Sequence, residues 1–154
     1  MIVNLEQFNS IRTKLKNDSL KLVFTNGCFD ILHKGHVYYL NETKKLGDFL
    51  IVGLNSDSSV KIIKGKNRPI NNENDRAYIL DNLKPVDAVI IFNEETPINL
   101  ISMIKPDYLV KGGDWKVENI VGSDLVRNYG GKVISIKYME NYSTTALLEE
   151  IKSK

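Results

Sequence analysis

The sequence is poor in several residue types. Its 154 residues include one cysteine, one tryptophan, two histidines and four prolines. A single cysteine cannot form an internal disulfide or build a cysteine-rich zinc site, and such cysteine usage is typical of a reducing compartment. No apolar run approaches the roughly 20 residues of a membrane-spanning helix, and the first residues lack the basic-then-apolar order of a signal peptide. We therefore expect a cytoplasmic protein that does not enter a membrane.

Neither sign of charge is in large excess, because 21 lysines and arginines stand against 19 aspartates and glutamates. A net charge of +2 is too balanced to indicate binding to nucleic acid or to a membrane surface. With 42% hydrophobic and 26% charged residues, the chain suits a single globular domain over residues 1–154. The expected partners are therefore small molecules.

Short apolar runs rich in branched residues alternate with segments of helical spacing along the chain. The predicted strands are 20–25, 48–55, 86–92, 107–110 and 132–136. The predicted helices are 5–17, 33–47, 72–83, 96–104, 121–131 and 143–154, the first of them within a helical extension over residues 1–19. Because parallel neighbours need crossover connections, the alternation predicts an α/β fold. We expect a Rossmann-like, doubly wound, five-stranded parallel sheet with helices on both faces and an additional N-terminal helix.

In such a sheet, ligands bind beyond the carboxyl ends of the strands, near the point where the strand order reverses. The stretch "TNGCFDILHKGHVYYL" leaves the first predicted strand and contains both histidines of the chain, His33 and His36. Three residues apart at the start of a helix, they project to nearly the same side. Paired imidazoles and a helix amino terminus favour an anion, and Gly27 and Gly35 let the backbone approach it closely. We predict a phosphate site, because a zinc site would lack an obvious third and fourth ligand.

Two motifs at opposite ends of the chain resemble those of one enzyme family. "GCFDILHKGH" resembles the G-x-F-D-x-x-H-x-G-H signature of the cytidylyltransferase-like nucleotidyltransferases, and "STTALLEEI" resembles their C-terminal S-T-T segment. Between them, "LGDFLIVGLNSD", "IKGKNRPIN", "VDAVIIFNEETP", "PDYLVKGGDW" and "YGGKVISI" are similar to the branch that adenylylates D-glycero-β-D-manno-heptose 1-phosphate. The resemblance covers about residues 20–152.

The resemblance implies an enzyme that joins ATP and heptose 1-phosphate into ADP-heptose and pyrophosphate, with Mg²⁺ as cofactor. It also implies a homodimer and a separate heptose kinase upstream. One alternative is a cytidylyltransferase that acts on glycerol 3-phosphate or another small polyol or sugar phosphate. The glycerol enzymes carry an arginine five residues before the serine of S-T-T, and Tyr138 stands there instead, which favours the heptose branch. A second alternative is a nucleotide sensor without catalysis, since doubly wound sheets also form binding modules.

Nucleotidyl transfer needs no covalent enzyme intermediate, so catalysis consists of positioning the substrates and neutralising charge on the phosphates. The resemblance assigns this catalytic role to four cationic residues, His33, His36, Lys64 and Arg76. Lys64 would contact the triphosphate, and Arg76 the triphosphate or the leaving pyrophosphate. The roles of Lys61 and Lys64 could be exchanged.

The other predicted site residues form two groups. The nucleotide-binding group is Asn26, Gly27, Cys28, Phe29, Gly35, Gly112, Gly113, Asp114, Ser143, Thr144 and Thr145. The sugar-phosphate-binding group is Asp30, Asn55, Asp57 and Lys61. Asp30 is also a candidate Mg²⁺ ligand, because carboxylate oxygens suit hard cations. The Cys28 thiol has no chemical role in an in-line displacement.

Overall fold

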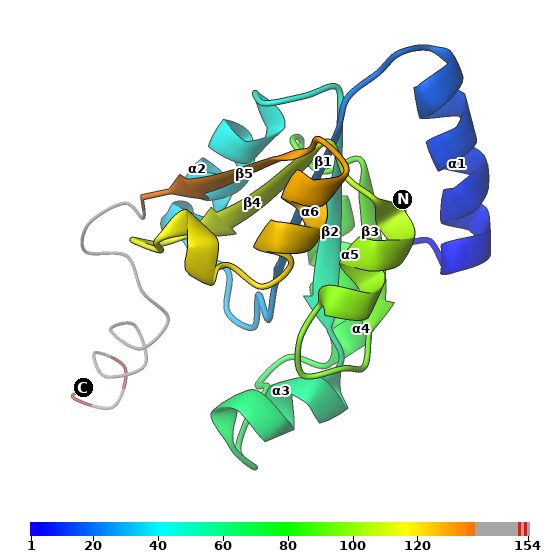
Figure 1. Ribbon diagram of the computed structural model, residues 1–154. Coiled ribbons are helices and arrows are strands. Elements are labelled where there is room, and N and C mark those ends of the chain that lie inside the picture. Colours follow the sequence, from blue (N-terminus) through cyan, green and yellow to red (C-terminus); the bar gives the residue numbers. More distant parts are fainter. Residues whose placement is uncertain (138–150, 152, 154) are drawn as a thin grey trace.

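The structure is a computed structural model that describes residues 1–137, 151 and 153. Its centre is a parallel sheet in the order β3-β2-β1-β4-β5 (Figure 1). The strands are β1 (Leu22–Gly27), β2 (Phe49–Asn55), β3 (Ala88–Phe92), β4 (Tyr108–Gly112) and β5 (Lys132–Ile136). The predicted five-stranded, doubly wound parallel sheet is therefore confirmed. The chain winds outward from β1 to β3 and then returns to β4, so the strand order reverses between β1 and β4.

Six α-helices and one 3₁₀ helix connect or flank the strands in the described part of the chain. They are α1 (Leu5–Asn17), α2 (Lys34–Lys44), α3 (Asp57–Lys64), α4 (Glu73–Asp81), α5 (Ile98–Ile104), η1 (Val117–Asn119) and α6 (Ser123–Asn128). Each predicted helix up to residue 131 is present. Most of the predicted helix over 143–154 lies outside the described residues, as do Ser143, Thr144 and Thr145.

The helix α3 was not predicted from the sequence. The Ser56 side chain caps it by accepting a hydrogen bond from the backbone N–H of Ser59, but only Ser59 and Val60 of its residues are buried. Ile62 and Ile63 are exposed, so little of the apolar surface of this helix packs on the core. Its helical form puts Lys61 and Lys64 in its last turn.

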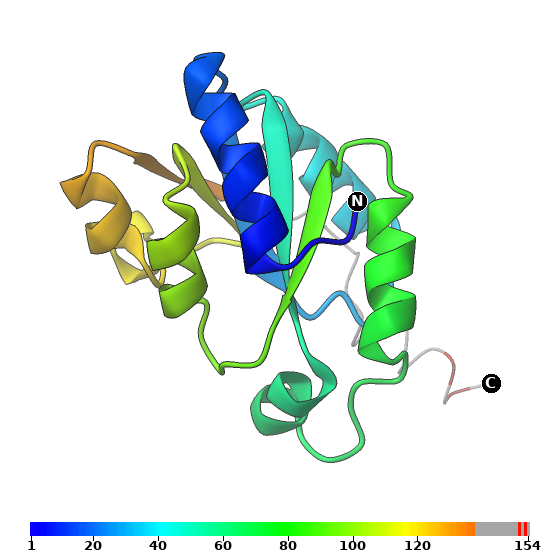
Figure 2. The same cartoon turned by 90° about the vertical axis from the view of Figure 1, so that its right-hand side faces the viewer.

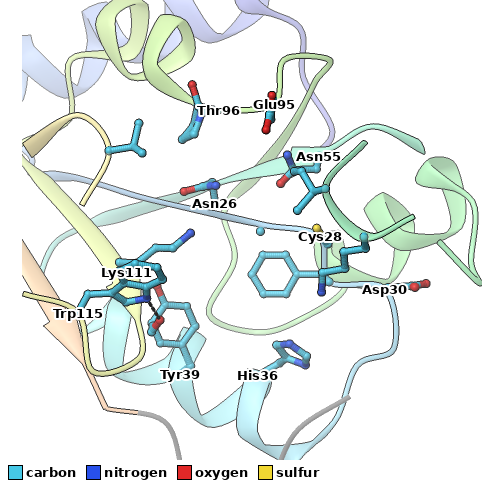
Figure 3. A pocket seen from close by; sticks show the side chains of 17 residues that line it. Asn26, Cys28, Asp30, His36, Tyr39, Asn55, Glu95, Thr96, Lys111 and Trp115 are labelled. Atoms are coloured by element: carbon cyan, nitrogen blue, oxygen red, sulfur yellow. Dashed lines mark hydrogen bonds between the residues drawn. The ribbon is translucent and has the colours of Figure 1, made fainter. Parts of the chain in front are cut away.

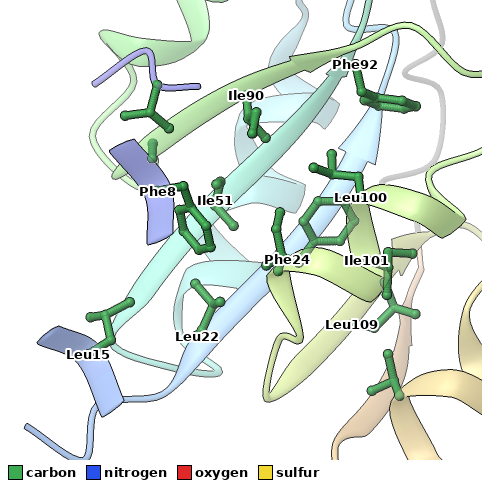
Figure 4. Close-up of a cluster of buried hydrophobic side chains, with 14 of the residues drawn as sticks. Phe8, Leu15, Leu22, Phe24, Ile51, Ile90, Phe92, Leu100, Ile101 and Leu109 are labelled. Carbon is green, nitrogen blue, oxygen red and sulfur yellow. The ribbon is translucent and has the colours of Figure 1, made fainter. Parts of the chain in front are cut away.

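Helices cover both faces of the sheet, as predicted. Alternate side chains of β1 point to opposite faces: Leu22 and Phe24 pack with α1 and α5, whereas Val23 packs with α2 and α4. The side chains on the face that α1 and α5 cover form a hydrophobic cluster, which Figure 4 shows. Figure 2 shows α1 lying across that face of the sheet. Among its members are Phe8, Leu15, Leu22, Phe24, Ile51, Ile90, Leu100 and Ile101.

The N-terminal segment is attached to the edge of the sheet. The backbone N–H of Val3 donates to the carbonyl oxygen of Val89 in β3 at 2.9 Å. Asn4 then caps α1 in a reciprocal pair of hydrogen bonds with Gln7. The predicted N-terminal helix is therefore confirmed as a layer of the fold. No helix in the described residues has the length and apolar character to cross a membrane.

Candidate active site

The strands β1 and β4 separate at their carboxyl ends. Their Cα pairing stops at Phe24 and Leu109, although both strands continue. Tyr39 of α2 bridges the widening gap, because its hydroxyl lies 2.6 Å from Thr25 Oγ1 and donates to the Val110 carbonyl oxygen at 3.3 Å. This buried bridge fixes the distance between the two strands where the site opens.

Replacing Tyr39 with phenylalanine is expected to lower the free energy of unfolding by about 1–3 kcal/mol, because the Thr25 hydroxyl and the Val110 carbonyl lose a buried partner. Urea unfolding followed by circular dichroism measures the change. Tyr78→Phe is the matched control, since Tyr78 is exposed and should shift stability by less than about 0.5 kcal/mol. Equal stabilities of the two variants would contradict the bridging role.

A cavity of about 460 Å³ lies at this reversal point (Figure 3). It brings together nine of the predicted site residues: Asn26, Gly27, Cys28, Phe29, Asp30, His36, Asn55, Lys64 and Gly112. They come from the ends of β1, β2 and β4, the first turn of α2 and the last turn of α3. The cavity therefore lies at the carboxyl edge of the sheet, where ligand binding was predicted.

The two histidines lie at the amino end of α2. His33 is the N-cap residue and His36 lies three residues on, with ring centroids 3.9 Å apart. Burial, followed by the positive charges of His33 and Lys64, lowers the pKa of His36 from 6.5 to about 4. At neutral pH the free protein thus holds an uncharged His36 ring in the cavity, next to the amino end of α2, where the helix dipole is positive. This end of the cavity is suited to bind a phosphate.

Close packing, and not an unusual backbone conformation, is the reason that a glycine suits position 27. A Cβ atom there would lie 3.0 Å from the ring of Phe29, which is itself held at a φ of +43°. The Phe29 ring in turn lies 5.4 Å from that of His36, measured between centroids. A glycine at position 27 therefore lets the ring stay beside His36.

Asp30 has a structural role in addition to lining the cavity. Its side chain is 1% exposed, and its carboxylate accepts from Arg68 Nε at 2.6 Å and from the backbone N–H groups of Ile70 and Asn71. Asp30 thus anchors the segment that follows α3 to the β1 loop. Its carboxylate accepts three hydrogen bonds within the protein, and its contact with a sugar phosphate or Mg²⁺ stays a prediction.

Arg76 lies behind the cavity rather than in it. Its side chain is fully buried, and each of its three nitrogens donates to a protein acceptor. The acceptors are the carbonyl oxygens of Asn71, Cys28 and Asn55 and the carboxylate of Asp57, the last at 2.7 Å. These bonds use all three nitrogens of Arg76 within the protein, whereas the predicted contacts of Arg76 with the phosphates and of Asp57 with the sugar phosphate stay predictions. Arg76 is a positioning residue that joins the loop after β1 to the end of β2.

The other predicted site residues that the structure describes, His33 included, do not line the cavity. Lys61 is exposed on α3, one turn before Lys64, and Gly35 is buried inside α2. Gly113 has a φ of +120°, and its N–H donates to the Ile136 carbonyl oxygen at 2.8 Å. Asp114 is exposed beside it.

Several lining residues were not predicted. They are Tyr39, Ile63, Glu95, Thr96, Pro97, Lys111, Trp115 and Val121. Glu95 and Thr96 follow β3, and Lys111 belongs to the end of β4, so their positions after predicted strands were an available signal. Trp115 is held by a hydrogen bond from its Nε1 to the Gly112 carbonyl oxygen at 3.1 Å.

The site has few ligands of its own for a metal ion. No group of three or more His, Cys, Asp or Glu side chains that could hold one occurs among the residues the structure describes. A Mg²⁺ ion here would be bound mainly by phosphate oxygens and water, as Mg²⁺ bound with nucleotides commonly is.

Comparison with known proteins agrees with this geometry. The family model described as "Cytidylyltransferase-like" matches residues 24–150. Two relatives named "Bifunctional protein HldE" are 52% identical over 152 residues (Nitratiruptor sp.) and 57% identical over 132 residues (Campylobacter concisus). They cover 99% and 86% of this chain, which spans 32% and 27% of their lengths.

A solved structure is also similar over its whole length. The lipopolysaccharide core biosynthesis protein from Thermoplasma volcanium superposes with a TM-score of 0.63 at 34% sequence identity. The match covers 80% of this chain and 99% of that one. The chain therefore belongs to the cytidylyltransferase-like family of nucleotidyltransferases, as its two motifs predicted.

Proposed function

We propose that this chain is an adenylyltransferase that condenses ATP with D-glycero-β-D-manno-heptose 1-phosphate to give ADP-heptose and pyrophosphate. The observation that carries the proposal is one cavity in which His36 and Lys64 meet the amino end of α2 at the reversal of strand order. The choice of adenine and heptose rests on the resemblance of "IKGKNRPIN" and "PDYLVKGGDW" to the heptose branch and on the relatives named HldE.

The reaction is an in-line displacement at phosphorus. An oxygen of the sugar phosphate forms a bond to the α-phosphorus of ATP, and the bond from that phosphorus to the oxygen bridging to the β-phosphate breaks. The electron pair leaves with pyrophosphate. His36, Lys64 and the α2 amides stabilise the negative charge that moves onto the leaving group.

Enzymes of this kind generally use Mg²⁺ with ATP, and we propose that the ion enters with the nucleotide. It would bridge phosphate oxygens and reduce their mutual repulsion. The cavity side chains orient the chelated triphosphate, with His36 and Lys64 as its donors.

Pyrophosphate release tests the function directly. The purified chain is incubated with Mg²⁺, one nucleoside triphosphate and one phosphorylated acceptor, and pyrophosphate is measured with a coupled assay. We expect release with ATP and heptose 1-phosphate, and none when either is omitted. ADP-heptose should appear in equal amount by mass spectrometry.

Two results would contradict the proposal. Release with CTP and glycerol 3-phosphate, but not with ATP and the heptose, would show a polyol-phosphate cytidylyltransferase. Tight ATP binding without release for any sugar or polyol phosphate would indicate a nucleotide sensor.

One route to a sugar 1-phosphate is phosphotransfer from a nucleoside triphosphate to the anomeric hydroxyl. We propose that a separate kinase carries out this step, and that this chain acts in the cytoplasm as a homodimer. Neither nucleic acid nor a membrane has a place in the reaction.

A further inference from the structure

Lys111 is a partly buried cation that the proposed chemistry has not yet used. It belongs to the end of β4, and its side chain extends into the cavity (Figure 3). Within residues 1–137, no carboxylate or other side chain forms an ion pair or hydrogen bond with its ammonium group. Burial lowers its pKa, and the nearby Cys28 thiol opposes the shift.

An ammonium group placed in this way is costly for the folded protein. Removal from water disfavours the charged form unless an opposite charge or hydrogen-bond acceptors replace the lost solvation. A ligand can supply the missing acceptors. A cationic side chain in a cleft whose pKa is shifted is a candidate for binding a ligand. Lys111 is therefore placed to bind an anionic group that enters the cavity.

Two anionic groups meet in the proposed reaction, the triphosphate and the phosphate of the acceptor. Figure 3 shows Lys111 reaching in from β4, on a different side of the cavity from His36. In an in-line displacement the entering and leaving oxygens lie on opposite sides of phosphorus. If His36 and Lys64 bind the leaving pyrophosphate, a cation elsewhere in the cavity is available to bind the phosphate of the entering acceptor.

The space beside Lys111 supports the same assignment. A smaller chamber of about 150 Å³ opens there, and Asn26, Trp115 and Asn119 are among its lining residues. Two amide groups and an aromatic face are suited to contact a polyhydroxylated ring. We propose that Lys111 binds the phosphate of the acceptor and thereby selects phosphorylated acceptors. This inference rests on the proposed function.

Lys111→Met tests the assignment, because methionine keeps the length of the side chain and removes the charge. We expect the KM for the sugar phosphate to rise about 10- to 100-fold, the effect of losing one charge-assisted hydrogen bond. The KM for ATP should change less than about 2-fold. The melting temperature should not fall, because the ammonium group that is removed is partly desolvated and has no side-chain partner among the described residues. Lys116→Met is the matched control, since Lys116 is exposed in the next loop.

A binding measurement separates this inference from the proposed function. Trp115 is the only tryptophan of the chain and lines the same chamber, so its fluorescence can report inorganic phosphate binding there. With α,β-methylene-ATP occupying the triphosphate site, phosphate should bind the wild-type protein and the Lys116→Met variant about 10-fold or more tightly than the Lys111→Met variant.

The two hypotheses can fail separately. Loss of phosphate binding in Lys111→Met would support the acceptor site. If the wild-type protein also released no pyrophosphate, that second result would refute only the adenylyltransferase activity. Unchanged phosphate binding, or weaker binding of α,β-methylene-ATP with an unchanged KM for the acceptor, would overturn the role of Lys111.

Discussion

Replacing Arg76 with methionine is expected to lower the free energy of unfolding by about 3–5 kcal/mol, the scale for breaking a buried ion pair by removing one partner. The side chain is fully buried, and its loss leaves the carbonyl oxygens of Cys28 and Asn55 and the Asp57 carboxylate without their donor. The loop after β1 would also lose its connection to the end of β2. Urea unfolding followed by circular dichroism gives the change.

The control for Arg76→Met is Arg127→Met, because Arg127 is exposed on α6 and its loss should cost less than about 0.5 kcal/mol. If Arg76→Met yields no folded protein, Arg76→Lys keeps the charge with fewer donors and should be destabilised by an intermediate amount. Similar stabilities of Arg76→Met and Arg127→Met would contradict the positioning role.

The architecture could be predicted because its signals are local. Each strand is a short apolar run that ends at, or is followed by, a polar or glycine residue, and helical spacing marks most of the segments between the strands. Parallel pairing then follows from the alternation alone. The helix α3 was not predicted because it has only eight residues, and its three apolar residues, Val60, Ile62 and Ile63, are too few to establish a helical period.

The position of the site could be predicted for a similar reason. Parallel strands deliver their carboxyl ends to one edge, so the residues after β1, β2 and β4 had to meet there. His36 was identifiable because histidine is rare in this chain and a helix start follows a strand there. The same reasoning located Asn26, Asn55 and Gly112, which all line the cavity.

The individual roles of buried charged residues could not be predicted. Arg76 bonds to groups 5, 48 and 21 positions away, at Asn71, Cys28 and Asn55, and no short motif contains that information. Asp30 likewise binds backbone N–H groups about 40 residues later. A motif identifies which residues gather at a site, but burial and hydrogen-bond partners decide which of them remain available to a substrate.

Lys111 was not predicted as a site residue because the chain contains many lysines. With 21 lysines and arginines, a single lysine is most simply interpreted as a solvated surface residue. Only the structure shows that Lys111 and Gly112, the last residues of β4, line the cavity and that the Lys111 side chain is partly buried there. The same applies to Tyr39, whose sequence context is an ordinary buried helix position.

Replacing His36 with alanine is expected to lower kcat for pyrophosphate release by about 10²- to 10³-fold, the scale for losing one donor to charge that develops in the transition state. The ring lies in the cavity at the first turn of α2, beside Phe29 and His33. Its pKa near 4 leaves it neutral in the free protein at pH 7, so it offers one N–H to the incoming phosphates. Saturating ATP and acceptor isolate the effect on turnover.

Two further variants show whether the donor itself matters. His36→Gln keeps an N–H donor without the ring and should retain more turnover than His36→Ala. Val37→Ala changes the neighbouring exposed residue of the same turn and should leave kcat within about 2-fold of the wild type. Because the loss is expected in a transition-state interaction, kcat and kcat/KM for ATP should fall together. A wild-type kcat in folded His36→Ala would remove the imidazole from the mechanism, and the stabilisation of the leaving pyrophosphate would then fall to Lys64 and the α2 amides.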